Sequence, residues 1–280
     1  MGISSRKYVD LIFKASGKYG NWDPPHTVEV GDWGEINRST GNFVREGNIF
    51  RDDQCKPLLS EISSTEFVRK GNPEDVVRIT AGTNVELKSD LYTGIGTTGE
   101  MGVRVQGAWE FTPQNRAALL TVTDPYSNYL EAGIIFPKLR KLRKLDGKAI
   151  VTEALHCPAY ALLLTDKGKG GKASISLYTG ISEAGAAAGA GAKAGWHYTS
   201  DSGFWRTACG YRMADGQDAV YTPLYRLERV SKGWLGRYRG APPSGSPPEE
   251  PVREVYPPPW DELDEDGEEV EEDSLMSPEF

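Results

Sequence analysis

The sequence predicts an α+β protein with a twisted, largely antiparallel sheet and flanking helices. Three observations lead to this class. Apolar and polar residues alternate with a period of two in several stretches of the first 240 residues. Helical segments are fewer, and strands and helices follow one another without the regular βα repeat of a parallel sheet. The 280 residues, 38% of them hydrophobic, are enough to bury a substantial core.

The chain divides into a body, residues 1–240, and a C-terminal tail, residues 241–280. Half of the 18 prolines lie in the tail, which also holds 14 acidic residues against one arginine. The whole chain has a net charge of −8, so the tail carries −13 and the body +5. Two interpretations stay open: a solvated, disordered tail, or a segment that docks on the basic body and masks it. Trp260, Val270 and Leu275 are candidate apolar anchors for docking.

The first predicted β-hairpin covers residues 76–112. From 77 to 87 the odd positions are mostly apolar and the even positions mostly polar, which predicts one long amphipathic strand. Residues 103–111 repeat this pattern after a glycine-rich connection. The residues that we assign to the apolar face are Val77, Ile79, Val85, Leu87, Val103, Val105, Trp109 and Phe111.

The second predicted hairpin joins residues 174–182, SISLYTGIS, to residues 190–198, AGAKAGWHY, with Ala192, Ala194 and Trp196 on its apolar face. Such alternation has two explanations. One is a half-buried antiparallel sheet in water. The other is a strand that crosses a bilayer within a barrel, which needs ~9 to 11 residues.

Two segments have helical character. Residues 6–18, RKYVDLIFKASGK, form either a short amphipathic helix or a strand, with Arg6, Lys7 and Lys14 beside the apolar positions. Residues 127–147 are predicted to form two helical pieces that break at Pro137 and end at Gly147. Beyond them, an apolar run at 159–165 and the turn DKGKGGK predict a strand, a turn and a second strand.

The second of these segments contains a dense basic run, whose cations are Lys138, Arg140, Lys141, Arg143, Lys144 and Lys148. Leucines lie between these charges at a spacing of three. Near an anionic membrane each cation contributes about 1 kcal/mol, so the run favours recruitment to acidic phospholipid if apolar burial assists. An ordinary solvated helix face stays possible. Nucleic acid is disfavoured, because no nucleic-acid-binding module accompanies the run.

Catalytic and cofactor motifs are weak. The segment GIGTTG at 94–99 matches a dinucleotide fingerprint, but a strand follows it where a helix is required. The histidines, His26, His156 and His197, and the cysteines, Cys55, Cys157 and Cys209, are too scattered for a metal site or a disulfide framework. We therefore expect no cofactor. The sequence shows no signal peptide or apolar membrane helix, so we expect synthesis in the cytosol.

Several of these features together resemble the pore-forming domain of gasdermins, in particular the compact fungal cell-death (allorecognition) branch. The similarity covers roughly residues 8–238. It rests on the basic amphipathic N-terminal segment, the two hairpins, the basic run, and the segments VEVGDWGEI (28–36), GNFVREGNIFRD (41–52), GKAIVTEAL (147–155) and AYALLLTDK (159–167). Animal gasdermins carry a large folded repressor where this chain has only its short tail.

The resemblance implies a cytoplasmic protein that binds acidic phospholipids, oligomerises and inserts its hairpins into the plasma membrane. It implies restraint by the tail until a protease or an allelic partner, as in heterokaryon incompatibility, releases it. We expect lipid binding by Arg6, Lys7, Lys14, Lys138, Arg140, Lys141, Arg143 and Lys144. We expect release near Tyr238, Gly240, Ser244 or Glu250, and inhibition through Trp260, Asp261 and Glu262. The alternatives are a non-inserting lipid- or protein-binding module, and an enzyme marked by a tight polar pocket.

Overall fold

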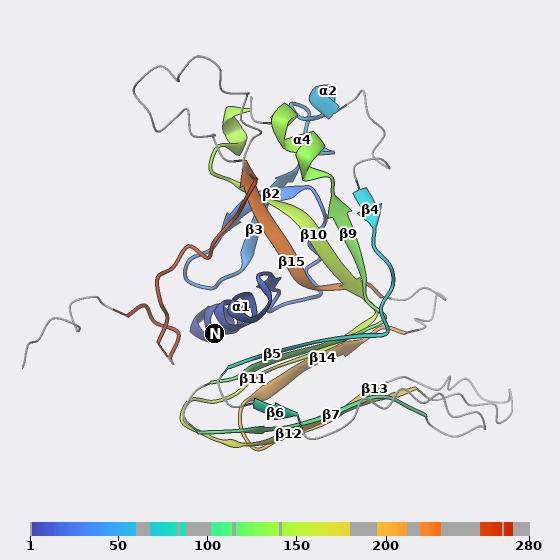
Figure 1. The fold of residues 1–280 in the computed structure, drawn as a ribbon, viewed down its shortest axis with the longest axis vertical. Helices are drawn as coiled ribbons and strands as arrows, with labels where there is room; N and C mark the ends of the chain where they lie inside the picture. The colour runs from blue at the N-terminus through green and yellow to red at the C-terminus, as the bar shows by residue number, and fades with distance from the viewer. Residues whose placement is uncertain are drawn as a thin grey trace, which may run out of the picture.

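The predicted α+β class with largely antiparallel sheets is confirmed by the structure, a computed structural model (Figure 1). Strand content exceeds helix content, and every strand pair that the structure describes is antiparallel. The described residues are 2–59, 68–82, 85–87, 102–113, 116–139, 142–179, 195–211, 219–230, 253–264 and 266–270.

Sheet A forms the upper half of the molecule in Figure 1. Its path runs β1-β15-β10-β2-β3, while β16 pairs with β15, β9 with β10, and β4 with β9. Every residue of β10 is buried, and neighbouring strands pair with both of its edges. The strands are β1 (Tyr19–Gly20), β2 (Asp32–Ile36), β3 (Phe43–Asn48), β4 (Val68–Lys70), β9 (Tyr126–Leu130), β10 (Ala149–Cys157), β15 (Tyr221–Val230) and β16 (Arg253–Val255).

Sheets B and C form two stacked layers in the lower half (Figure 1). Sheet B has the order β14-β11-β8-β5 and sheet C the order β13-β12-β7-β6. A separate apolar cluster, which includes Trp109, Ile175 and Trp205, lies between them. The strands are β5 (Val76–Ala81), β6 (Val85–Leu87), β7 (Gly102–Phe111), β8 (Ala118–Thr123), β11 (Ala159–Leu164), β12 (Gly171–Thr179), β13 (Gly195–Ser200) and β14 (Phe204–Cys209).

The two layers are a four-stranded sheet folded back on itself. Each strand of sheet C is joined directly in sequence to the strand at the same place in sheet B. We call the line along which the chain passes from sheet B to sheet C the fold line. The strand registers place four residues of sheet B side by side along it, namely Ala81, Ala118, Leu164 and Phe204. Gly203 has φ +78 at this line, and a Cβ there would lie 2.1 Å from the Leu164 carbonyl oxygen. The edge connections therefore depend on glycine.

The prediction of one continuous strand over residues 77–87 is wrong. The chain bends at Gly82, which has φ +110, and continues from β5 in sheet B to β6 in sheet C. Val77 and Ile79 pack against the main core of the molecule and do not face sheet C. Alternation with a period of two continues across such a bend, so the sequence pattern alone does not reveal it.

The N-terminal segment is a helix, α1 (Gly2–Ser16), which resolves the choice between helix and strand. It lies between sheet A and sheet B and buries Tyr8, Val9 and Ile12 in the main core (Figure 1). Gly17, with φ +67, follows the helix and donates its N–H to the Phe13 carbonyl at 2.7 Å. The other helices are α2 (Lys56–Leu59), α4 (Ala132–Leu139) and the short 3₁₀ helix η1 (Arg143–Leu145).

The prediction of two helical pieces over residues 127–147 is right in number and wrong in its boundaries. The first residues belong to strand β9, and α4 runs through Pro137 to Leu139. Pro137 lies in the last turn of α4, where its lack of an N–H removes one backbone hydrogen bond. Gly147, with φ +73, ends the second piece as expected. The strand, turn and strand predicted after residue 159 are β11, residues 165–170 and β12.

Candidate functional site

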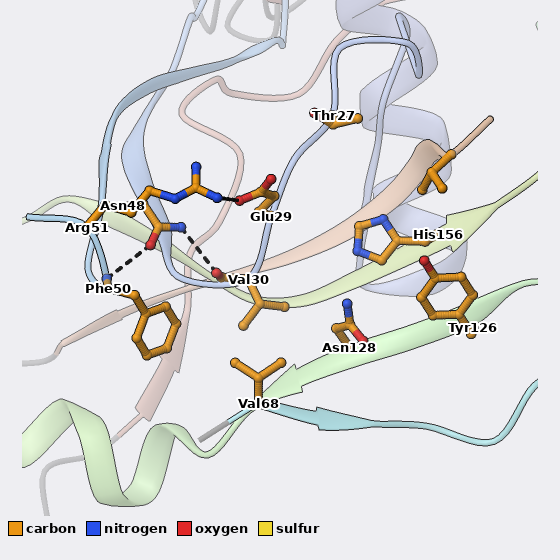
Figure 2. Close-up of a pocket in the computed structure, with 11 residues that line it drawn as sticks. Thr27, Glu29, Val30, Asn48, Phe50, Arg51, Val68, Tyr126, Asn128 and His156 are labelled. Carbon is orange, nitrogen blue, oxygen red and sulfur yellow. Dashed lines mark hydrogen bonds and ion pairs between the residues drawn. The ribbon is translucent and has the colours of Figure 1, made fainter. Parts of the chain in front are cut away.

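A pocket of about 440 Å³, lined by both polar and apolar residues, lies where the loop before β2 meets β9 and β10 (Figure 2). His156 is buried beside it, and its Nδ1 lies 3.2 Å from the Thr222 hydroxyl. Burial lowers the pKa of His156, so the imidazole is neutral at pH 7. The Asn48 amide donates to the Val30 carbonyl, and Arg51 pairs with Glu29. The described residues that line the pocket include no serine or cysteine, and the hydroxyl beside the imidazole is that of the buried Thr222.

The C-terminal tail is docked on the body over residues 253–270. Strand β16 extends sheet A by pairing with β15, and Arg229 forms a salt bridge of 2.7 Å with Glu254. The Tyr19 hydroxyl then donates to the Tyr256 carbonyl at 2.9 Å. The described part of the tail therefore begins with a regular strand that is paired with the body.

Trp260 and Leu263 anchor the tail in the main hydrophobic core, with 8% and 5% of their surfaces exposed. The Trp260 indole N–H donates to the Asp10 carboxylate of α1 at 3.2 Å. Val270 is 41% exposed and does not anchor the tail, while Leu275 lies outside the described residues. Of the three anchors considered, Trp260 is therefore the one that the structure buries.

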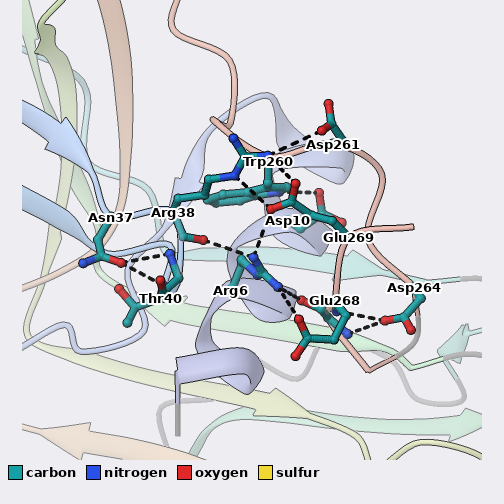
Figure 3. A network of polar contacts seen from close by, with 12 residues as sticks. Arg6, Asp10, Asn37, Arg38, Thr40, Trp260, Asp261, Asp264, Glu268 and Glu269 are labelled. Atoms are coloured by element: carbon teal, nitrogen blue, oxygen red, sulfur yellow. Dashed lines mark hydrogen bonds and ion pairs between the residues drawn. The ribbon is translucent and has the colours of Figure 1, made fainter. Parts of the chain in front are cut away.

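A tight turn follows, organised by Asp264. Its Oδ1 accepts hydrogen bonds from the backbone N–H groups of Asp266, Gly267 and Glu268 at 2.8 to 2.9 Å. Desolvation acts to raise the pKa of Asp264, but these donors lower that pKa overall. The turn directs the Gly267 carbonyl toward α1 (Figure 3).

Arg6 and Lys7 of α1 are buried beneath this turn (Figure 3 shows Arg6). Arg6 donates to the Gly267 carbonyl and lies 3.2 Å from the Glu268 carboxylate and 3.3 Å from that of Glu269. The Lys7 ammonium donates to the backbone carbonyls of residues 263 and 264 at 3.3 and 2.5 Å. The tail thus satisfies two cations that would otherwise be solvated.

More exposed ion pairs surround these buried contacts. Arg38 pairs with Glu269 and lies 3.4 Å from Asp261, and Lys167 pairs with Asp266. The hydrogen bond from Arg38 lowers the pKa of Glu269. Sequence reasoning missed Arg38, Lys167 and Asp10, because each is an isolated polar residue far in sequence from the tail. Glu262 is exposed, and its carbonyl accepts from the Val270 N–H at 3.0 Å within the tail.

The predicted basic face over residues 138–148 is not one continuous helical surface. Lys144 pairs with Asp52 and lies 5.7 Å from the centre of the Trp33 ring, while Lys148 is 2.6 Å from both Glu35 and Glu46. Leu139 and Leu145 are buried in the core, so they are not free for a membrane. Acidic partners from distant segments account for this difference. Elsewhere, Lys138 is half-buried, Arg143 is exposed, Lys14 pairs with Asp10, and Arg140 and Lys141 lie outside the described residues.

The pairing within the second predicted hairpin is confirmed, whereas that within the first holds only for residues 85–87, because β5 pairs with β8 in sheet B. Strand β6 pairs with β7 and β12 with β13, and β7 lies beside β12, so the two hairpins adjoin. Val105, Trp109 and Phe111 are buried between the layers, and Trp196 packs partly against them. Polar side chains such as Gln106 and His197 face outward. Some predicted residues lie outside the part of the chain that the structure describes. For the strands these are the side chains of Val85, Leu87 and Val103 and the whole of Ala192 and Ala194. The same holds for the predicted release residues, Tyr238, Gly240, Ser244 and Glu250.

Comparison with known proteins identifies no relative: neither a family model nor a curated protein matches the chain. In the portion that the structure describes, no helix has the length and apolar character needed to cross a membrane. The function therefore has to be inferred from sheets B and C and from the docked tail.

Proposed function

We propose that this chain is a pore-forming protein with a gasdermin-like fold, which permeabilises acidic phospholipid membranes and causes cell death. The observation that carries the proposal is the folded-over sheet. Two adjacent hairpins, each with one apolar and one polar face, lie against sheet B at a single fold line. Opening along that line turns the buried apolar face outward without breaking any hydrogen bond between neighbouring strands of sheet C.

The lengths of the two central strands fit a bilayer. Strand β7 has 10 residues and β12 has 9, and a membrane barrel strand needs ~9 to 11. At ~3.4 Å per residue and a tilt of ~45°, strands of this length span about 22 to 24 Å, close to the ~25 Å apolar band. The edge strands β6 and β13 expose unpaired backbone groups, which are prohibitive in hydrocarbon. A homo-oligomer that closes these edges into a barrel is therefore required.

The docked tail supplies the restraint. Arg6 and Lys7 are buried because the tail covers them, and Arg38 at the rim is occupied by tail carboxylates. When the whole tail leaves, these cations become exposed and meet water or lipid phosphate, so no charge is left buried without a partner. Each cation then adds about 1 kcal/mol to binding an anionic surface. In the intact chain the same cations are not available to lipid.

Release requires proteolysis between β15 and the docked segment followed by detachment of the cut tail at an anionic membrane, or displacement of the tail by a partner protein such as an allelic variant. In this proposal the protein stays in the cytoplasm while the tail is docked and moves to the plasma membrane afterwards. No role for nucleic acid or for a cofactor is proposed.

The test compares dye release from vesicles that contain phosphatidylserine with release from neutral phosphatidylcholine vesicles. The full chain, a chain ending at Gly240, and a control chain ending at Val270 are compared. We expect leakage only with the chain ending at Gly240, and only from anionic vesicles. Binding without leakage would instead identify the non-inserting lipid-binding module. If the first two chains leak anionic vesicles equally, the tail has no inhibitory role.

A further inference from the structure

The contact between sheets B and C contains a polar interruption at Arg78. This arginine lies on β5, and its Nη2 crosses to sheet C, where it donates to the Gln106 carbonyl of β7 at 2.5 Å. Its Nε and Nη1 are buried, and neither has a hydrogen-bond partner in the described part of the chain. Burial also lowers the pKa of Arg78, as expected for a cation that is poorly solvated.

Thr121 lies directly opposite Arg78 in the register of β5 and β8. It is fully buried, and among the described residues its hydroxyl has no hydrogen-bond partner. Alternation along β8 places Thr121 on the same face as Leu119, which packs toward sheet C. Two polar side chains therefore meet, incompletely satisfied, in the layer between the sheets.

This polar pair separates two apolar clusters. Toward the fold line lies the larger cluster around Trp109 and Trp205, and farther away lies a small one with Val105 and Leu177. Buried donors without partners cost free energy, and water would satisfy them as soon as the layers separate. The contact is therefore weaker at this point than an all-apolar contact of the same area.

We propose that Arg78 and Thr121 form a built-in weak point that sets how readily sheet C separates from sheet B. The inference rests on the proposed function, because separation is the step that would free the hairpins for the membrane. The weak point lies inside the body and acts independently of the tail, so its effect on separation is measurable in the full-length chain as well as in the tail-free chain.

The test uses amide hydrogen exchange in the soluble full-length protein, with no membrane present. Arg78→Met and Thr121→Val each replace a poorly satisfied polar group by an apolar one of similar size. We expect exchange in β7 and β12 to slow by about tenfold in Thr121→Val, the factor that matches one unsatisfied buried group, and also to slow in Arg78→Met, which removes two unsatisfied donors together with the hydrogen bond to Gln106. Should Arg78→Met disturb the fold, Thr121→Val, which is nearly isosteric, decides the result.

Three controls separate this effect from general stabilisation. Thr152→Val removes a buried hydroxyl without a described partner from β10 of sheet A, so it should leave exchange in β7 and β12 unchanged. Thr123→Val removes a hydroxyl that contacts the Tyr211 hydroxyl at 2.9 Å, so it should speed exchange. Arg69→Met removes an exposed charge and should change nothing.

Unchanged or faster exchange in Thr121→Val overturns the inference, and so does equal slowing in Thr152→Val. In the tail-free chain, Arg78→Met and Thr121→Val should also slow dye release from anionic vesicles several-fold. If exchange slows as expected but no chain ever causes leakage, the weak point is supported and the proposed function fails. The two ideas therefore fail in different measurements.

Discussion

Trp260 and Asp10 are 250 residues apart in sequence, yet the indole N–H of Trp260 donates to the Asp10 carboxylate at 3.2 Å. The same carboxylate lies 2.9 Å from the Lys14 ammonium on the next turn of α1. Asp10 thus connects the tail to the helix that carries Arg6 and Lys7. Because α1 also packs on sheet B, the tail lies one helix away from the sheet that supports the hairpins.

Replacing Trp260 with alanine is expected to free the tail in the uncut chain. Truncation of a buried tryptophan costs about 3 kcal/mol or more, because both burial and packing are lost. Full-length Trp260→Ala should then leak anionic vesicles without proteolysis. Val270→Ala is the matched control, since Val270 is 41% exposed, and it should stay inactive. If the full-length Trp260→Ala variant causes no leakage although hydrogen exchange shows that its tail amides are no longer protected, docking of the tail does not inhibit pore formation.

Cutting the chain between β15 and β16 is not expected to detach the tail by itself. The strand pairing of β16, the Trp260 anchor and the contacts of Arg6 all remain after such a cut. A protease site introduced within residues 241–250 allows this to be measured by gel filtration. The fragment should co-elute with the body at physiological salt and separate when anionic vesicles are added. Neutral vesicles serve as the control, and immediate separation in buffer would contradict the expectation.

Acid should weaken tail docking. The pKa values of Glu269 and Asp264 are lowered in the folded chain, so their contribution is fully present above the ordinary carboxyl pKa values of 4.5 and 3.8. It is lost as pH falls through the lowered values. In the cut protein, the tail should therefore dissociate more readily at about pH 3 than at pH 6. A Glu269→Gln variant should show a smaller difference, and release that is independent of pH would rule out this linkage.

The fold line between sheets B and C should be sensitive to Gly203. A Cβ there would overlap the Leu164 carbonyl oxygen, and φ +78 is unfavourable for alanine. Gly203→Ala should lower the free energy of unfolding by more than ~1 kcal/mol, as measured by urea denaturation. Gly133 in α4 is the matched control, because a Cβ there meets nothing within 4 Å. Gly133→Ala should leave stability unchanged or raise it by about 0.5 kcal/mol.

Arg6 and Lys7 should matter more for vesicle binding than Lys144. In the tail-free chain, Arg6→Gln and Lys7→Gln should each weaken binding to anionic vesicles about fivefold, the equivalent of about 1 kcal/mol. Lys144→Gln should have a smaller effect, because Lys144 already pairs with Asp52 and lowers the pKa of that carboxyl. Co-sedimentation with vesicles measures all three. If the three variants lose the same affinity for anionic vesicles, the basic run at residues 138–148 does take part in lipid binding.

Much of the local structure and the distribution of charge could be predicted from the amino-acid sequence. Side-chain alternation is a local property of an extended chain, so it predicted strands β7, β12 and β13 and the pairing of β12 with β13, but only three residues of the first hairpin pairing. The contrast between a basic body and an acidic tail followed from composition alone. The helix of residues 2–16 was left open, because a short amphipathic segment fits either period.

The contacts between these elements could not be predicted from the sequence, because they depend on how the chain packs in three dimensions. The bend at Gly82 divides a single alternating pattern between two sheets, and local pattern does not record the direction of the chain after a glycine. The partners of Lys144 and Arg6, which are Asp52 and the Gly267 turn, are brought together by packing of segments remote in sequence. Whether a charge is masked or available depends on such long-range contacts, because electrostatic attraction acts through space and not along the chain.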